Sequence, residues 1–174
     1  MSNMIEAARI KYKPDNIKYL LVAEAPPDEN SNRFFYYECV DEKDSLFLET
    51  MKVLYPDDYT DAKTVRKMKI QFLEKFKDDG FYLIDSTDQP MPNYSRTKKL
   101  KQMKKSLPVL KEKISGLVEK KTKIILISST VYEVCEEPLK TMGFNIINQE
   151  MIDFPGSGGQ VKYRTKMTEL LNNR

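Results

Sequence analysis

The sequence predicts one α/β domain of three layers, in which helices cover both faces of a central four-stranded parallel sheet. Four short apolar runs, each of a length suited to a buried strand, alternate with stretches whose apolar residues recur every three or four positions. Such alternation is typical of parallel sheets, because a crossover helix returns the chain to the start of the next strand. With 174 residues, 40% of them hydrophobic, we expect residues 1–174 to form a single domain with one core.

The first predicted strand, residues 17–23, is an apolar run rich in Leu, Val and Tyr. Glu24 follows it directly, and a pair of prolines then ends the strand, since proline has no N–H for the sheet ladder. Four consecutive aromatic residues, Phe34 to Tyr37, come after a polar loop. This strand therefore brings a carboxylate to its carboxyl end, the edge at which open α/β sheets bind ligands.

Two amphipathic helices are predicted next. Asp44 or Ser45 is suited to cap the first, which ends before a proline. Thr60 or Asp61 is suited to cap the second, which runs to about residue 79 and ends before a glycine.

The second predicted strand covers residues 81–84 and ends at Asp85. After a loop, apolar residues at helical spacing predict a long helix over residues 98–119. Pro108 lies inside this helix, so we expect either a kink or two helices with Ser106 capping the second.

The C-terminal part of the chain adds two more strands and two more helices. The third strand is predicted at residues 123–127 and the fourth at residues 144–147. Between them, a serine or threonine among residues 128–130 is suited to cap a helix over residues 132–141. A loop and a last helix, from about residue 160 to 171, complete the chain.

The composition excludes several kinds of site. The sequence has no histidine, which is the commonest general base and metal ligand, so we expect no metal, no cofactor and no histidine-dependent triad. Its two cysteines, Cys39 and Cys135, are far apart, which favours a reduced, cytoplasmic setting. The apolar runs are too short to cross a membrane, and the N-terminus has no apolar secretory segment.

The charge of the chain is unevenly distributed. Residues 97–123 hold ten lysines and two glutamates, a net charge of +8, whereas the whole chain carries +3. This asymmetry is compatible with a polyanionic partner. The alternative is a lysine-rich helix face that is only solvated.

Three loops are expected to meet at the carboxyl edge of the sheet. One follows Ala23, one follows Ile84 and one lies around Phe154. The residue sets where they begin or end are Ala23-Glu24-Ala25-Pro26, Phe81-Tyr82-Leu83-Ile84-Asp85 and Phe154-Pro155-Gly156-Ser157-Gly158-Gly159. From about residue 17 onward, this set resembles the uracil-DNA glycosylase superfamily. In that superfamily a first strand ends in a motif like G-E-A-P-G or G-Q-D-P, and an aromatic residue stacks on the base. A second strand ends in an asparagine that reads the base edge, and a late H-P-S-P loop contacts DNA and the leaving base.

Four positions depart from these motifs. Ala23 stands in place of the first glycine, and Ala25 takes the position of the aspartate in G-Q-D-P. Glu24 is therefore the only carboxylate of the first motif. Asp85 replaces the asparagine, and Phe154 replaces the histidine of the late loop.

The resemblance implies hydrolysis of the N-glycosidic bond of a damaged or deaminated base that is flipped out of DNA. Glu24 would hold the attacking water and favour the cationic sugar. Phe34 or Phe35 would stack on the base, in a pocket that includes Ala23 and Ala25. The alternatives are a loop carboxylate with a local partner and aromatic rings that pack in the core.

Asp85 is the sharpest discriminator of base specificity. An asparagine amide matches uracil because it both donates and accepts, whereas an ionised aspartate only accepts. Asp85 would thus favour a base with an amino group, as on cytosine, adenine or guanine. The alternative is that Asp85 caps the turn that follows it.

The late loop and the helix after it are the candidate DNA contacts. They comprise Phe154, Pro155, Gly156, Ser157, Gly158, Gly159, Lys162 and Arg164. Phe154 cannot donate a hydrogen bond as the histidine does, but backbone N–H groups of a glycine-rich turn can bind an anion. The alternative is a strand-to-helix connection that only needs flexible glycines.

We therefore expect a divergent DNA glycosylase, active as a monomer on single- or double-stranded DNA. The alternative is a catalytically inactive relative that binds nucleic acid or a nucleotide in the same cleft.

Overall fold

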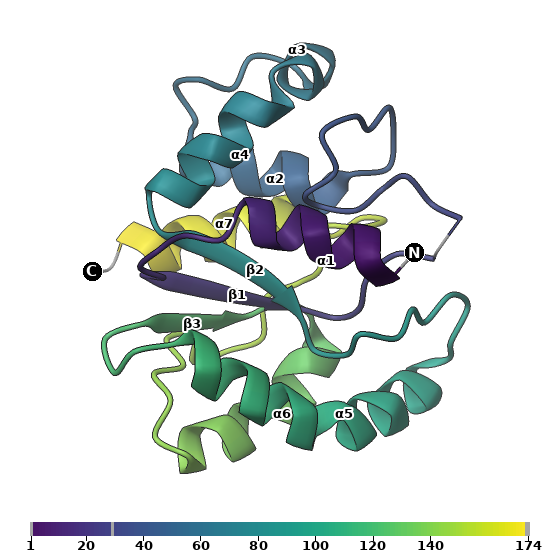
Figure 1. Ribbon diagram of the computed structural model, residues 1–174, viewed down its shortest axis with the longest axis vertical. Helices are drawn as coiled ribbons and strands as arrows, with labels where there is room; N and C mark the ends of the chain where they lie inside the picture. Colours follow the sequence, from purple (N-terminus) through teal and green to yellow (C-terminus); the bar gives the residue numbers. More distant parts are fainter. Residues whose placement is uncertain (1, 29, 173–174) are drawn as a thin grey trace.

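A computed structural model describes residues 2–28 and 30–172 of the chain. Its elements, in chain order, are α1 (Ser2–Lys11), β1 (Tyr19–Ala23), α2 (Ser45–Leu54), α3 (Ala62–Lys67), α4 (Lys69–Asp78), β2 (Phe81–Asp85), α5 (Arg96–Leu117), β3 (Lys123–Leu126), α6 (Ser129–Thr141) and α7 (Gln160–Asn172). The sheet lies in the middle, with α1, α2, α4 and α7 on one side and α5 and α6 on the other (Figure 1). The predicted three-layer α/β arrangement is confirmed.

The sheet has three parallel strands in the order β2-β1-β3. Every residue of β1 and β2 is buried, as expected for a parallel sheet that is covered on both faces. In register, Ala23 at the end of β1 pairs with Asp85 at the end of β2. The two strands therefore deliver their last residues to the same place.

The predicted fourth strand is wrong for the described residues. Residues 144–147 run beside β3, but they form only an isolated bridge between Ile124 and Ile146. At the next position the side chain of Asn148 replaces the backbone: its Oδ1 accepts from the N–H of Leu126 at 3.0 Å and its Nδ2 donates to the Leu126 carbonyl at 3.2 Å. An amide side chain satisfies the edge of β3 here, so the ladder is interrupted.

One helix prediction, and one of the two alternatives for the helix that contains Pro108, also need correction. The single helix predicted up to residue 79 is divided at Met68 into α3 and α4. By contrast, α5 continues through Pro108 as one helix, and the side chain of Ser106 donates to Thr87 at 3.0 Å instead of capping a second helix. A proline inside a helix removes one backbone hydrogen bond, and packing of the remaining turns outweighs that loss here.

Several predicted helix ends are confirmed. Asp61 accepts a hydrogen bond from the N–H of Thr64 and caps α3, and Ser128 accepts one from Val131 and caps α6. Gly80 ends α4 with a φ of +83°, a backbone conformation that glycine adopts easily. None of the described helices has the length and apolar character needed to cross a membrane.

The outer edge of β2 is closed by a tyrosine side chain. The hydroxyl of Tyr36 donates to the Leu83 carbonyl at 3.0 Å and accepts from the Leu83 N–H at 2.7 Å. Tyr36 is only 1% exposed, so water cannot replace it. One side chain thus supplies both bonds that a further strand would have made, and it fixes the aromatic segment next to the sheet.

We expect Tyr36→Phe to lower the free energy of unfolding by about 1 to 3 kcal/mol, because it leaves the buried N–H and C=O of Leu83 without partners. Urea denaturation measures this change. Tyr37→Phe is the matched control, since the Tyr37 hydroxyl has no hydrogen-bond partner in the described structure. Equal stability of the two variants would contradict the assigned role of Tyr36.

Candidate functional site

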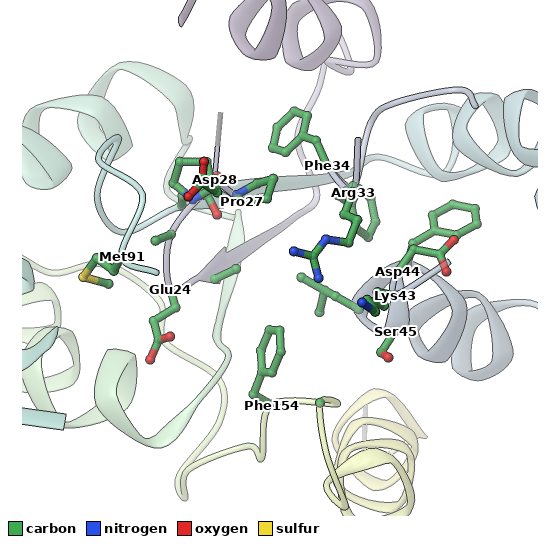
Figure 2. Close-up of a pocket in the computed structure, with 18 of the residues that line it drawn as sticks. Glu24, Pro27, Asp28, Arg33, Phe34, Lys43, Asp44, Ser45, Met91 and Phe154 are labelled. Carbon is green, nitrogen blue, oxygen red and sulfur yellow. The ribbon is translucent and has the colours of Figure 1, made fainter. Parts of the chain in front are cut away.

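A cleft of about 600 Å³ opens at the carboxyl ends of β1 and β2. Residues of all three predicted loops line it, among them Glu24, Asp85 and Gly156. Ala23 and Ala25 also line it, and their small side chains leave space beside the strand end. Figure 2 shows Phe154 between Glu24 on one side of the cleft and Arg33 and Lys43 on the other.

Glu24 is held in one orientation by donors from α5 and α6, the two helices that lie on the same side of the sheet (Figure 1). Lys99 of α5 donates to its Oε2 at 2.8 Å, and Thr130 of α6 donates to its Oε1. The carboxylate is still about one-fifth exposed at 21%. It is therefore a fixed, ionic acceptor that solvent or a ligand can reach.

A strained residue lies behind this carboxylate. Ser128, directly after β3, has φ +87° and ψ 151°, a region that residues other than glycine rarely occupy. Its hydroxyl shares a 3.0 Å hydrogen bond with Thr130, the residue that donates to Glu24. The strain at Ser128 is thus stored in the turn that positions the partner of Glu24.

Asp85 lies at the floor of the cleft and is paired with Arg9 of α1. Arg9 Nη2 donates to Asp85 Oδ2 at 2.7 Å, and both residues are 4% exposed. Burial raises the pKa of Asp85 from 3.8 to about 6, while the Arg9 guanidinium acts in the opposite direction. At neutral pH Asp85 is therefore an ionised acceptor with a buried counter-ion.

Phe34 and Phe35 line the cleft, but their rings belong to the core. Phe34 is 2% and Phe35 is 5% exposed. Phe34 makes edge contacts with Tyr36 and Tyr37, and Phe35 packs against Phe47. The more accessible aromatic ring of the cleft is that of Phe154, which is 45% exposed.

The loop that carries Phe154 is tightly folded. A Cβ atom on Gly159 would lie 2.2 Å from the Phe154 carbonyl oxygen, so the loop requires glycine at this position. Gly158 has a φ of +80°. Gly156 and Ser157 line the cleft beside Phe154, whereas Pro155 is buried and does not line it.

The structure separates the two basic residues predicted after this loop. Lys162 lines a second groove of about 470 Å³, which adjoins the cleft at Glu24 and Phe154 and also contains Arg96 and Lys99. Arg164 instead forms an ion pair with Glu49 of α2. Arg164 is thus engaged between α7 and α2 and lines neither the cleft nor the groove.

Several residues of the site were not predicted from the sequence. Arg33 and Lys43 line the wall opposite Glu24 (Figure 2), and Arg33 Nε donates to Ser31 at 2.7 Å. Asp44 also lines the cleft, but Arg66 binds its carboxylate with two nitrogens, Nε at 3.0 Å and Nη2 at 2.6 Å, so Asp44 does not cap α2. Arg33 could have been predicted to line the site, because it is a cation in the polar loop that follows the first strand.

No group of three or more cysteine or acidic side chains in the described part of the chain could hold a metal ion. The cleft itself presents a fixed carboxylate, a buried acceptor, an exposed aromatic ring and the cations of Arg33 and Lys43. Comparisons with protein-family models, curated proteins and solved structures found no match to this chain.

The Arg9–Asp85 pair predicts how stability depends on pH. Because the folded-state pKa of Asp85 lies above the unfolded value, the folded protein binds more protons between pH 3.8 and about 6. The contribution of Asp85 to stability is thus fully present below 3.8 and is lost as the pH rises through about 6. Arg9→Leu removes the opposing cation, so we expect the pKa to rise further, by about 1 unit or more.

Carboxyl ¹³C NMR titration measures this pKa directly, and urea denaturation across the same pH range measures the matching loss of stability. Glu6→Gln is the control, because it removes the other partner of Arg9 and leaves the contact with Asp85 in place. An unchanged pKa in Arg9→Leu would show that the guanidinium does not act on Asp85.

Proposed function

We propose that the cleft binds a nucleobase flipped out of DNA and that the protein hydrolyses its N-glycosidic bond, as a divergent member of the uracil-DNA glycosylase superfamily. The observation that carries this proposal is the arrangement of two carboxylates in one cleft. Glu24 follows β1 and Asp85 ends β2, and Ala23 pairs with Asp85 in the sheet. In this proposal one acid acts on the sugar and the other contacts the base.

Glu24 has the properties that the hydrolytic step needs. It accepts hydrogen bonds from Lys99 and Thr130, and its carboxylate oxygens retain further lone pairs that can accept from a water molecule. The oxygen of that water forms a bond to the anomeric carbon as the bond to the base nitrogen breaks. The electron pair leaves with the base, which takes up a proton, and the water gives a proton to Glu24 or to solvent.

Phe154 and the adjoining groove supply contacts to the rest of the nucleic acid. The exposed ring of Phe154 separates the cleft from the groove that contains Arg96, Lys99 and Lys162. Aromatic rings stack on bases without regard to sequence, and lysine and arginine attract phosphates. We propose that Phe154, rather than the buried Phe34 or Phe35, stacks against the base, and that the backbone follows the groove.

A second candidate function is binding of nucleic acid or a nucleotide without hydrolysis. The contacts of Glu24 favour it, because Lys99 occupies one carboxylate oxygen and Thr130 the other, which leaves them less available to an attacking water. The late loop also lacks a side chain that donates to a leaving base, since Phe154 takes the histidine position. The two candidates share the cleft and differ only in whether a base is released.

We expect Glu24→Gln to slow base release about 100-fold or more, because an amide cannot take the proton of the attacking water. Oligonucleotides with single modified or normal bases are the substrates, and free base is measured by chromatography. Binding of the same oligonucleotides should change little, since the amide still accepts from Thr130.

Glu136→Gln is the matched control for this experiment. Glu136 also forms an ion pair with a lysine, Lys140, but it lies on α6 and lines neither the cleft nor the groove. Salt-dependent DNA binding without base release from any oligonucleotide would select the second candidate. Absence of DNA binding at low salt would refute both.

A further inference from the structure

The floor of the cleft offers hydrogen-bond acceptors with no donor beside them. Asp85 Oδ2 accepts from Arg9, but no donor in residues 2–28 and 30–172 forms a hydrogen bond with Oδ1. Each carboxylate oxygen has two lone pairs. Asp85 lines the cleft and also a smaller pocket beside Thr87 and Lys113. A ligand that reaches the carboxylate from the cleft meets Oδ1 and the second lone pair of Oδ2, and both can only accept.

Arg9 favours the ionised form of this carboxylate. Its guanidinium is buried, lies 5.4 Å from the centre of the Phe34 ring and donates from Nη1 to Glu6 at 3.0 Å. If Asp85 turned away or became neutral, the buried guanidinium would keep only the exposed carboxylate of Glu6 as its partner, which is unfavourable. Arg9 thus holds the Asp85 carboxylate in place, and both of its oxygens remain able to accept hydrogen bonds from a ligand.

Building on the nucleobase-binding function proposed above, we propose that Asp85 selects a base of the guanine type. The pairing edge of guanine carries a ring N–H next to an exocyclic amino group, and two parallel donors match two carboxylate oxygens. Adenine and cytosine place the amino group beside a ring nitrogen with a lone pair, which a carboxylate repels. Uracil and hypoxanthine place the ring N–H beside a carbonyl oxygen and so offer only one donor.

The cleft has room for a purine. Its volume of about 600 Å³ lies within the range of sites that hold small molecules. Ala23 and Ala25 leave space next to the strand end, and the Phe154 ring is available for one face of the base. Asp85 is then the residue that distinguishes the edge of the base, while stacking accepts any base.

Single-stranded DNA trinucleotides that differ only in the central base test this inference on the whole protein. Replacing guanine by hypoxanthine removes only the exocyclic amino group and one charge-assisted hydrogen bond. We expect guanine to bind roughly 10- to 100-fold more tightly than hypoxanthine or uracil in a fluorescence competition assay. Equal affinities for the three would overturn the proposal.

A double variant, Arg9→Leu with Asp85→Asn, reverses the chemistry at the floor without leaving a buried charge unpaired. The amide both donates and accepts, so the preference should move from guanine to hypoxanthine and uracil. Asp88→Asn is the matched control, because Asp88 is exposed, pairs with Lys113 and does not line the cleft. Circular dichroism shows whether the double variant is folded. If it is unfolded, the affinities of the wild-type protein for the guanine, hypoxanthine and uracil trinucleotides decide whether the proposal holds.

Base release, measured separately, distinguishes this inference from the proposed function. A guanine preference without any base release would refute hydrolysis but support the specificity assigned to Asp85. Release of guanine, hypoxanthine and uracil at equal rates would overturn the specificity and leave the function standing. No binding of any trinucleotide would overturn both.

Discussion

The structure depends on how the two edges of a three-stranded parallel sheet are satisfied. Each edge strand has backbone N–H and C=O groups that no neighbouring strand pairs, and burial makes unpaired groups costly. Tyr36 bonds both groups of Leu83 on β2, and Asn148 does the same for Leu126 on β3. Side chains thus supply bonds that a further strand would make at each edge, and on β3 the backbone of residues 145–152 supplies the others. The aromatic segment and the segment after α6 are held against the sheet, where they help to form the walls of the cleft.

The acidic residues of the site are likewise compensated by side chains from neighbouring elements. Parallel strands end at one edge, so Glu24 and Asp85 both lie there, and their carboxylates bind partners on opposite faces of the sheet. Two acids so near a buried strand end need compensation. Arg9 supplies it from one face of the sheet, and Lys99 supplies it from the other. Each helical layer therefore supplies the cation for one acid of the cleft, α1 for Asp85 and α5 for Glu24.

The sequence predicts features that are decided locally and misses those decided by distant contacts. The caps at Asp61 and Ser128 were predictable, because a short polar side chain before an apolar periodic segment binds the nearest free N–H groups. The apolar run near residue 145 predicts a strand, but competition from the Asn148 amide is a tertiary effect. The helix continues through Pro108 for the same kind of reason. Arg9 gave no signal, since its partner lies in another part of the chain.

The ion pair between Arg9 and Asp85 also bears on the order of folding. Its members are 76 residues apart in the chain, and Glu24 is 106 residues from Thr130. Contacts of such separation form only after long loops have closed, whereas helical turns form from neighbours. The helices can therefore be present before the cleft acquires its counter-ions. A nascent chain that lacks the third strand would hold Glu24 without Thr130, so the contacts that orient Glu24 are complete only when the last third of the chain has been added.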